Sequence, residues 1–476
     1  MQKWSHYFLS ISLVTIYGCS VLEHKNASWN DPLDDQDDIR KATKASFNVE
    51  GRGKYPETLF VIASSGGGSR AAVFTANVFL KLEDTIINEG SDSSNLLAEV
   101  DAISAVSGST LPTAYYAISK AEGEVCQAEL DDSYARQKWS KKQVRKKMRK
   151  NFQLQWLARW FLPQNIVRFW FTSYDRSDIM AQVFANTLYD RRFKLGTYTF
   201  GEICDDRPNI ILNATNGTTS VLPAYTNPTP SCPDVEVEKS FGALFTFTDC
   251  EFRRLGSSIA SYPIANAVMS SSAFPAAFNY TTLRNFNLQK RAGTDNAYLH
   301  LFDGGNHDNL GLESAWRLIE KNIIEENQKS FKRIVVLLID SYIKPKGVDN
   351  TSPEARTGFD YLVDSNFFDS FDSLLAKNRF SLIKGFSDKM ANLNDTHPEL
   401  TTFFYHLAFN EIPDLDIKNQ INSIGTSFKI DKKDAKALEL AVDLLLSKEN
   451  RCYTTLKNTI IGKEPSSNNC LSSFDN

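Results

Sequence analysis

The stretch TLFVIASSGGGSRAAVFTANVFLKLED, from Thr58 to Asp84, decides the fold. It opens with a run of apolar and β-branched residues, which is typical of a strand buried on both faces of a parallel sheet. Three glycines follow at 66–68, and the residues after them place apolar side chains at helical spacing. A buried strand, a tight turn and a helix in this order indicate an α/β protein.

The same alternation recurs along the chain. Strand-like and helix-compatible segments alternate, which predicts a three-layer α/β/α architecture with a central, mostly parallel sheet. Binding and catalytic sites in such sheets lie at the carboxyl ends of strands. The later strand-like segments are EVDAISAV (99–106), PNIILNAT (208–215), YLHLFD (298–303) and RIVVLLIDSY (333–342).

Length and composition limit the number of domains and the kind of partner that can be expected. The chain has 476 residues, which exceeds the usual size of one core, so one large domain with additions or two domains are expected. It is 42% hydrophobic and 23% charged, with a formal net charge of -4. A nucleic-acid partner is not indicated, because it would call for a strong basic excess.

Two of the strand-end turns have unusual sequences. SSGGGSRA (64–71) lets the backbone approach a ligand and point N–H groups at an anion, as an oxyanion hole, a phosphate cradle or a plain tight turn would. AVSGST (105–110) places Ser107 on a strand-to-helix turn, as in a nucleophile elbow. Ala105 and Ser109 stand where that elbow usually has glycine, and both are small. The alternative is a serine-rich turn without function.

The third turn is LFDGGNHDNLG (301–311), in which a predicted strand ends in Asp303 before two glycines. This arrangement predicts a carboxylate at the carboxyl edge of the sheet. DGG alone is a frequent turn sequence. A glycine-rich loop, a serine and an aspartate that each follow a strand, in that order, are more specific together than any one of them.

In this order the three turns resemble those of patatin-like phospholipases, the family that also includes the cytosolic phospholipase A2 catalytic domain. A fourth block, SSSAFPAAF (270–278), matches the Ser-Ala-x-Pro-x-x-Phe segment of that family, and DGGNHDNLGL resembles its bacterial lipoprotein members. The resemblance extends from about Leu59 to Tyr342. It implies a patatin-like fold, here with a largely helical insertion.

The resemblance also implies the roles of individual residues. Ser107 would be the nucleophile and Asp303 the base that activates it, and Arg70 would lie near the substrate phosphate, a structural salt bridge being its alternative. A serine hydroxyl needs such a base, and burial raises the proton affinity of a carboxylate toward neutrality. Ala105 departs from the family pattern. The N–H groups implied for the oxyanion hole are those of Gly66, Gly67 and Gly68, with that of Gly108.

A histidine-based triad is the competing chemistry. His307 follows Asp303 closely, but the chain order serine, aspartate, histidine favours a later loop, and so His397 or His406. Neither residue lies in a recognisable strand-end turn. Surface or packed histidines are therefore the expected alternative.

The N-terminus predicts export and a lipid anchor. Lys3 and His6 precede an apolar run that is too short to cross a bilayer. Ile16-Tyr17-Gly18-Cys19 resembles a bacterial lipoprotein lipobox, which implies cleavage of the signal peptide 1–18 and acylation of Cys19. The implied location is the cell envelope, at the outer membrane facing the periplasm. A plain secretory signal and an uncleaved anchor are the alternatives.

The remaining organisation follows from composition. Residues 19–56 are polar and predict a flexible tether, 57–345 form the predicted patatin-like catalytic domain, and 346–476 are expected to pack on it. An insertion at about 122–198 is basic from Arg136 to Lys150 and then aromatic. This composition suits docking on a membrane, and it equally suits a solvated helix face with aromatics in the core.

Six further cysteines in an exported chain suggest disulfides, with local pairs such as Cys232 with Cys250 and Cys452 with Cys470, or free buried thiols. No cofactor, metal or nucleic acid is implied. The predicted activity is hydrolysis of phospholipid carboxylic esters through a Ser107–Asp303 dyad and an acyl-serine, at a membrane surface. The alternatives are a catalytically silent lipid- or partner-binding lipoprotein, and a carboxylesterase or lysophospholipase with the same dyad.

Overall fold

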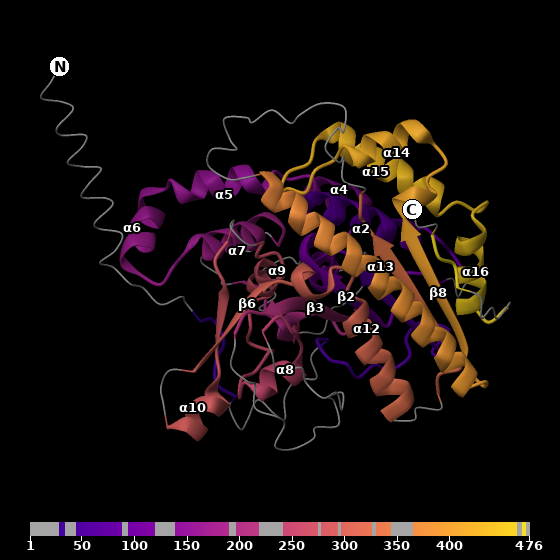
Figure 1. Ribbon diagram of the computed structural model, residues 1–476, viewed down its shortest axis with the longest axis horizontal. Coiled ribbons are helices and arrows are strands. Elements are labelled where there is room, and N and C mark those ends of the chain that lie inside the picture. Colours follow the sequence, from indigo (N-terminus) through magenta and orange to yellow (C-terminus); the bar gives the residue numbers. More distant parts are fainter. Residues whose placement is uncertain are drawn as a thin grey trace, which may run out of the picture.

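The fold is seen in a computed structural model, and its centre is a mixed sheet of eight strands (Figure 1). The strand order is β5-β6-β3-β2-β1-β7-β8, and β4 pairs with β3 off this path. The structure describes residues 28–33, 44–87, 94–119, 139–189, 197–218, 241–274, 278–293, 297–325, 330–343, 365–463 and 469–472. The strands are β1 (Thr58–Ser64), β2 (Ala102–Val106), β3 (Asn209–Asn216), β4 (Leu244–Phe247), β5 (Thr281–Arg284), β6 (Tyr298–Asp303), β7 (Arg333–Asp340) and β8 (Thr401–Ala408).

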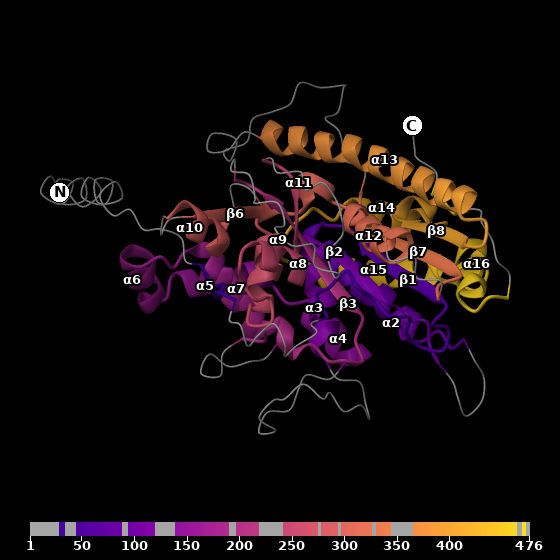
Figure 2. The same ribbon diagram turned by 90° about the horizontal axis from the view of Figure 1, so that it is seen from below.

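Helices cover both faces of this sheet, and the alternation along β1 shows why. Phe60 and Ile62 point into a core shared with α2, α3 and α15, whereas Leu59 and Val61 point into a second core with α12 and α13. Figure 2 shows α12 and α13 on one side of the sheet and α2, α3 and α4 on the other. The predicted three-layer α/β/α architecture is confirmed.

The helices that form these layers and the attached segments have the following bounds. They are α2 (Gly68–Glu83), α3 (Thr110–Ile118), α4 (Lys141–Met148), α5 (Phe152–Trp160), α6 (Pro163–Phe171), α7 (Arg176–Thr187), α8 (Asp249–Arg254), α9 (Ile264–Ser271), α10 (Phe286–Ala292), α11 (Gly305–Asp308), α12 (Leu312–Ile319), α13 (Ser365–Thr396), α14 (Leu415–Asn422), α15 (Lys432–Leu445) and α16 (Arg451–Ile460).

The five strands β1, β2, β3, β7 and β8 are parallel, but β6 runs antiparallel to β3. It overlaps β3 for only three residues, with Asp303 opposite Ala214. On the other side of β3, Val106 at the end of β2 pairs with Asn213, the residue before Ala214. The end of β6 and the end of β2 therefore lie at the same level, one on each side of β3.

Residues before 57 and after 345 pack on the same sheet and helices as the segment 57–345. The later part of the chain supplies β8, which extends the sheet beside β7, and α15, which packs on α2. Part of the segment expected as a tether also packs on the body, because Phe47 and Val49 are buried in the second core. Cys452 and Cys470 form a disulfide that holds the end of the chain against β8, as the spacing suggested.

Some sequence predictions fall outside the described residues. Cys19, the signal peptide and Cys232 are among them. Cys204 and Cys250 are disulfide-bonded. Within the described ranges, no helix has the length and apolar character needed to span a membrane.

Candidate active site

Ser107 lies at a sharp turn between β2 and the 3₁₀ turn at Ser107–Ser109 that leads into α3. Its φ is +51°, and among the described residues it is the one non-glycine residue with a positive φ. A side chain in this conformation is strained, and such strain is characteristic of nucleophile elbows. The backbone N–H of Ser107 donates to Ser271 Oγ at 2.9 Å, and Ser271 Oγ donates to Asn213 O at 2.5 Å. These contacts fix the turn against α9 and β3.

Ala105 and Ser109, which stand where a nucleophile elbow usually has glycine, both fit this turn. Ala105 is fully buried and its strand pairs with Ser64 on one side and Leu212 on the other, so a methyl group is accommodated in the core. Ser109 uses its hydroxyl to accept from the Val106 N–H at 3.0 Å and to contact Ser64 O at 2.8 Å. The sharp turn at Ser107 therefore forms without glycine at positions 105 and 109.

Asp303 is the partner of the serine. Ser107 Oγ donates to Asp303 Oδ2 at 3.1 Å, and the Gly305 N–H donates to Oδ1 at 2.8 Å. The carboxylate is 6% exposed, and burial raises its pKa to about 7 although both hydrogen bonds act to lower it. A base with a pKa near neutrality is suited to take a proton from a serine hydroxyl at physiological pH.

The glycine loop lies directly beside this dyad. A Cβ on Gly66 would come within 3.1 Å of Ser107 Cβ, so the glycine is needed for close approach. The Gly66 N–H, expected to point at an oxyanion, instead donates to Asn309 O at 2.9 Å. Gly67 and Gly68 have φ values of +140° and +58° at the start of α2. In the part of the chain that the structure describes, no protein oxygen accepts from their N–H groups, which leaves them available to an oxyanion.

Gly108 completes the contact between the elbow and the glycine loop. A Cβ at this position would lie 2.0 Å from Gly68 O and 2.7 Å from Gly68 N. Only glycine therefore lets the two backbones approach this closely. The close approach brings the backbone of Gly68 against the residue that follows Ser107.

We expect Gly108→Ala to lower the rate of any reaction at Ser107 by roughly 10²–10³-fold, the loss that follows removal of one oxyanion donor elsewhere. The added methyl group must push the glycine loop away from the elbow. Gly385→Ala in α13 is the matched control, because a Cβ there meets no atom within 4 Å. Steady-state rates with a soluble ester test this, and equal losses in both variants would contradict it.

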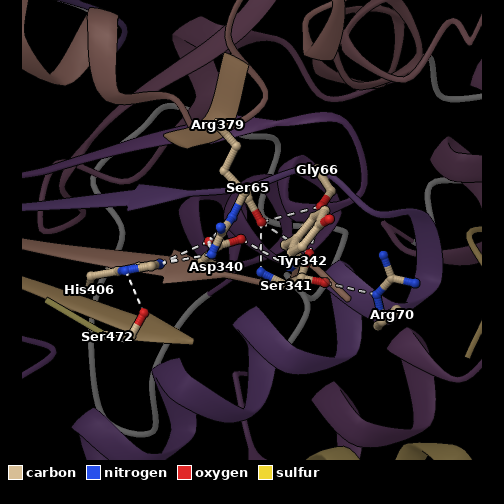
Figure 3. A network of polar contacts seen from close by, with 9 residues as sticks. All are labelled: Ser65, Gly66, Arg70, Asp340, Ser341, Tyr342, Arg379, His406 and Ser472. Atoms are coloured by element: carbon tan, nitrogen blue, oxygen red, sulfur yellow. Dashed lines mark hydrogen bonds and ion pairs between the residues drawn. The ribbon is translucent and has the colours of Figure 1, made fainter. Parts of the chain in front are cut away.

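Arg70 lies in α2 next to the loop, but its guanidinium faces the protein interior (Figure 3). The side chain is 5% exposed, and it donates from Nε to Ser341 O at 2.9 Å and from a terminal nitrogen to Ile424 O at 2.5 Å. Ser341 Oγ in turn donates to Gly66 O at 2.6 Å. Arg70 thus braces the glycine loop, and a role toward a substrate phosphate stays a prediction.

A second polar network lies next to the contacts of Arg70 and Ser341, at the end of β7 (Figure 3). Buried Asp340 accepts from Arg379 at 2.6 Å and from His406 Nε2 at 2.9 Å, while His406 Nδ1 contacts Ser472 Oγ at 2.8 Å. Burial would raise the pKa of Asp340, but Arg379 and His406 hold it well below its ordinary value. The serine, histidine and aspartate of this network are all buried, with Ser472 at 3% exposed, so they support the fold.

The histidines that competed for a triad lie elsewhere. His406 pairs with Asp340, His397 pairs with Glu399 at 3.3 Å, and His307 pairs with Glu313 at 2.5 Å. The oxygen that Ser107 contacts belongs to Asp303. Within the described residues, the side chain that accepts from Ser107 Oγ is thus a carboxylate and not an imidazole.

Three supporting residues were missed by sequence reasoning. Ser271 lies in the SSSAFPAAF block, so the block was noticed but its contact with the Ser107 N–H was not. Asn309 and Ser341 hold the Gly66 N–H and Gly66 O, and nothing local in the sequence marks either contact. Among the described residues, no cluster of His, Cys, Asp and Glu has the arrangement of a metal site.

The protein was compared with known families, curated proteins and solved structures. A scan of protein families and a search of curated proteins find no match. The search of solved structures finds human GIVD cytosolic phospholipase A2. The TM-score is 0.43 at 12% identity, over 85% of this chain and 63% of that chain, so this chain spans less than two thirds of its neighbour. Residue roles here rest on the geometry of this chain.

Proposed function

We propose that the protein is a lipid acyl hydrolase that cleaves carboxylic ester bonds of phospholipids through Ser107 and Asp303. The observation that carries the proposal is the 3.1 Å hydrogen bond from Ser107 Oγ to Asp303 Oδ2, beside the N–H groups of Gly67 and Gly68. A strained serine, a buried carboxylate of raised pKa and backbone donors in one place are the components of acyl transfer. The choice of a lipid ester rests on the sequence resemblance.

The reaction follows from the positions of these groups. Ser107 Oγ attacks the carbonyl carbon of the ester while Asp303 Oδ2 accepts the hydroxyl proton. The N–H groups of Gly67 and Gly68 stabilise the oxyanion of the tetrahedral intermediate. Asp303 then protonates the leaving alcohol, and the acyl group stays on Ser107. Water attacks the acyl-serine while Asp303 accepts a proton from it, and Asp303 then returns this proton to Ser107 Oγ as the bond to the acyl group breaks and the fatty acid leaves.

Release of fatty acid tests this proposal. Purified protein is given mixed micelles of a phospholipid, of its lysophospholipid, or a short soluble ester, beside Ser107→Ala. Release from phospholipid that disappears in the variant supports the proposal. Activity confined to lysophospholipid or the soluble ester indicates a lysophospholipase or carboxylesterase, and activity on none of them indicates the catalytically silent lipoprotein.

The pH dependence should report Asp303. The base must be ionised, and burial raises the pKa of Asp303 to about 7. We therefore expect kcat/KM to rise about tenfold per pH unit below this pKa and to level off above it. Measurement of kcat/KM with a soluble ester between about pH 5 and pH 9 checks whether the rate rises with pH. Activity that increases as the pH falls would count against a carboxylate base.

Membrane attachment through acylated Cys19, in the cell envelope, is part of the same proposal and rests on the lipobox-like sequence. Incorporation of labelled fatty acid into the protein, compared with Cys19→Ala, tests it. Equal labelling of both proteins would contradict acylation at this cysteine.

A further inference from the structure

The helical hairpin α5–α6 has an inverted pattern of burial. In α6 the buried residue is Asn165, whose Nδ2 donates to Arg159 O at 2.8 Å and closes the turn between the two helices. Phe152 and Trp156 of α5 pack on the core, but other apolar side chains of the hairpin face outward. The most exposed of them form what we call the hairpin patch: Leu154 (62% exposed), Phe161 (73%), Ile166 (39%), Val167 (56%) and Phe171 (66%).

A water-soluble helix normally buries its apolar side chains and exposes its amides. An exposed group of Phe, Leu, Ile and Val over two consecutive helices therefore marks an interaction surface. The hairpin keeps its shape through internal contacts, since the rings of Trp156 and Trp160 lie 5.1 Å apart and those of Trp160 and Phe169 lie 6.2 Å apart. Both views show α6 at one end of the long axis of the molecule (Figures 1 and 2).

The charge around the hairpin patch selects its partner. From residue 141 to residue 174 the chain has nine Lys and Arg and no Asp or Glu, in a protein whose net charge is -4. Lys141 pairs with Asp84, Arg145 pairs with Glu439, and buried Lys147 donates to Thr187 O at 3.0 Å. Seven of the nine basic residues lie at 141–150, on or just after α4, and Arg159 and Arg168 lie on the hairpin itself. Exposed cationic side chains in the same stretch of chain as exposed aromatic and aliphatic ones match a bilayer surface, where anionic headgroups lie above acyl chains.

The hairpin is also connected to the active site. The Phe152 N–H at the start of α5 donates to Phe428 O at 3.0 Å, and Trp156 packs on Phe278 with ring centroids 5.3 Å apart. The neighbouring Ser427 O accepts from the Ser69 N–H at 2.7 Å, directly after the glycine loop. The hairpin therefore contacts the segment that covers the loop beside Ser107.

We propose that the hairpin patch docks the protein on a lipid bilayer that contains anionic lipids. Phe161 and Phe171 enter the interface, and the exposed basic residues of 141–174 hold the headgroups. This inference deepens the proposed function, because it names the surface by which the enzyme would reach its substrate. Docking itself requires neither Ser107 nor hydrolysis.

Co-flotation with vesicles tests the docking surface. All proteins carry Ser107→Ala and Cys19→Ala, so that neither hydrolysis nor an attached lipid affects the result. The double variant Phe161→Ser, Phe171→Ser is compared with Leu415→Ser on α14, a side chain that is equally exposed at 70% but lies outside the hairpin. Vesicles consist of phosphatidylcholine alone or of phosphatidylcholine with phosphatidylglycerol, at low and high salt.

We expect binding to the phosphatidylglycerol vesicles that weakens at high salt, falls at least tenfold in the double variant and is unchanged by Leu415→Ser. Thermal melting should show that the double variant stays folded, since both side chains are exposed.

Equal binding of all three proteins, or no binding by any, overturns the proposal. A dimer by light scattering that the double variant converts to monomer also overturns it, because a second copy then covers the patch. Hydrolysis of a soluble ester by protein that retains Ser107 is measured separately, so failure of docking and failure of the proposed function are distinguishable.

Discussion

Asp303→Asn is expected to abolish turnover and at the same time to stabilise the fold. The amide keeps the shape of the carboxylate and can still accept from the Gly305 N–H, but it cannot take the proton of Ser107. We expect the rate to fall by roughly 10²–10⁴-fold, the usual contribution of a general base.

The gain in stability follows from the raised pKa. Burial raises the pKa of Asp303 from 3.8 to about 7, so the folded protein holds this proton more tightly than the unfolded chain does. The free energy of unfolding of the wild type therefore falls as the pH rises from about 4 to about 7, and it stays lower above that pH. Asn has no such penalty, and at about pH 8 the variant should gain on the order of 2–4 kcal/mol.

Urea unfolding at about pH 8 and about pH 4 measures this difference, which should be present at the higher pH and small at the lower one. Ser107→Ala is the matched control. It also loses activity, but it leaves the buried carboxylate in place without its serine partner, so it should not be stabilised. A lower unfolding free energy for Asp303→Asn at the higher pH would show that Asp303 is stabilising when ionised, contrary to the assigned pKa.

The second large effect is expected at Asp340. Its carboxylate has no exposed surface and pairs with Arg379 and His406, so Asp340→Ala removes the acidic member of a buried ion pair. Breaking a buried pair in this way costs about 3–5 kcal/mol. Because the pKa of Asp340 is held below its ordinary value, this stability is present above about pH 4 and is lost as the pH falls further.

Urea midpoints for Asp340→Ala and for Asp443→Asn provide the comparison. Asp443 pairs with Lys81 at 3.2 Å but is 58% exposed, so its loss should change the unfolding free energy by about 1 kcal/mol or less. The network also supports Ser341 and the glycine loop, and surviving Asp340→Ala protein should have a reduced rate. A loss for Asp340→Ala no greater than that of the control would mean that the network does not hold the fold.

The proximity of Ser107, Asp303 and the glycine loop was predictable because each of them follows a strand in a short local pattern. Ser107 and the glycine loop follow parallel strands β2 and β1, whose carboxyl ends meet at one edge. Asp303 reaches the same edge for a different reason, since β6 is antiparallel and stops after three pairs with β3. The direction of β6 could not be read from YLHLFD, because strand polarity depends on a partner far away in the chain.

The contacts that support Ser107 and the glycine loop could not be predicted either, because their partners are far away in the sequence. β8 is a short apolar segment whose place beside β7 is set by long-range pairing, so the alternation of strands and helices along the sequence did not predict it. Likewise, nothing near Gly66 in the sequence indicates that its N–H donates to Asn309 O. In the insertion, the aromatic run was evident from the sequence, but only the structure shows that Asn165 is buried while Phe161 and Phe171 are exposed.

The most direct test of the central claim is labelling with a fluorophosphonate, which reacts with an activated serine. Intact mass should show one adduct per chain, peptide mapping should place it on Ser107, and Ser107→Ala should remain unlabelled. Asp303→Asn should label far more slowly than wild type, because its serine has lost the base. An unlabelled wild type, or an adduct that persists in Ser107→Ala, would contradict the assignment of Ser107 as the nucleophile.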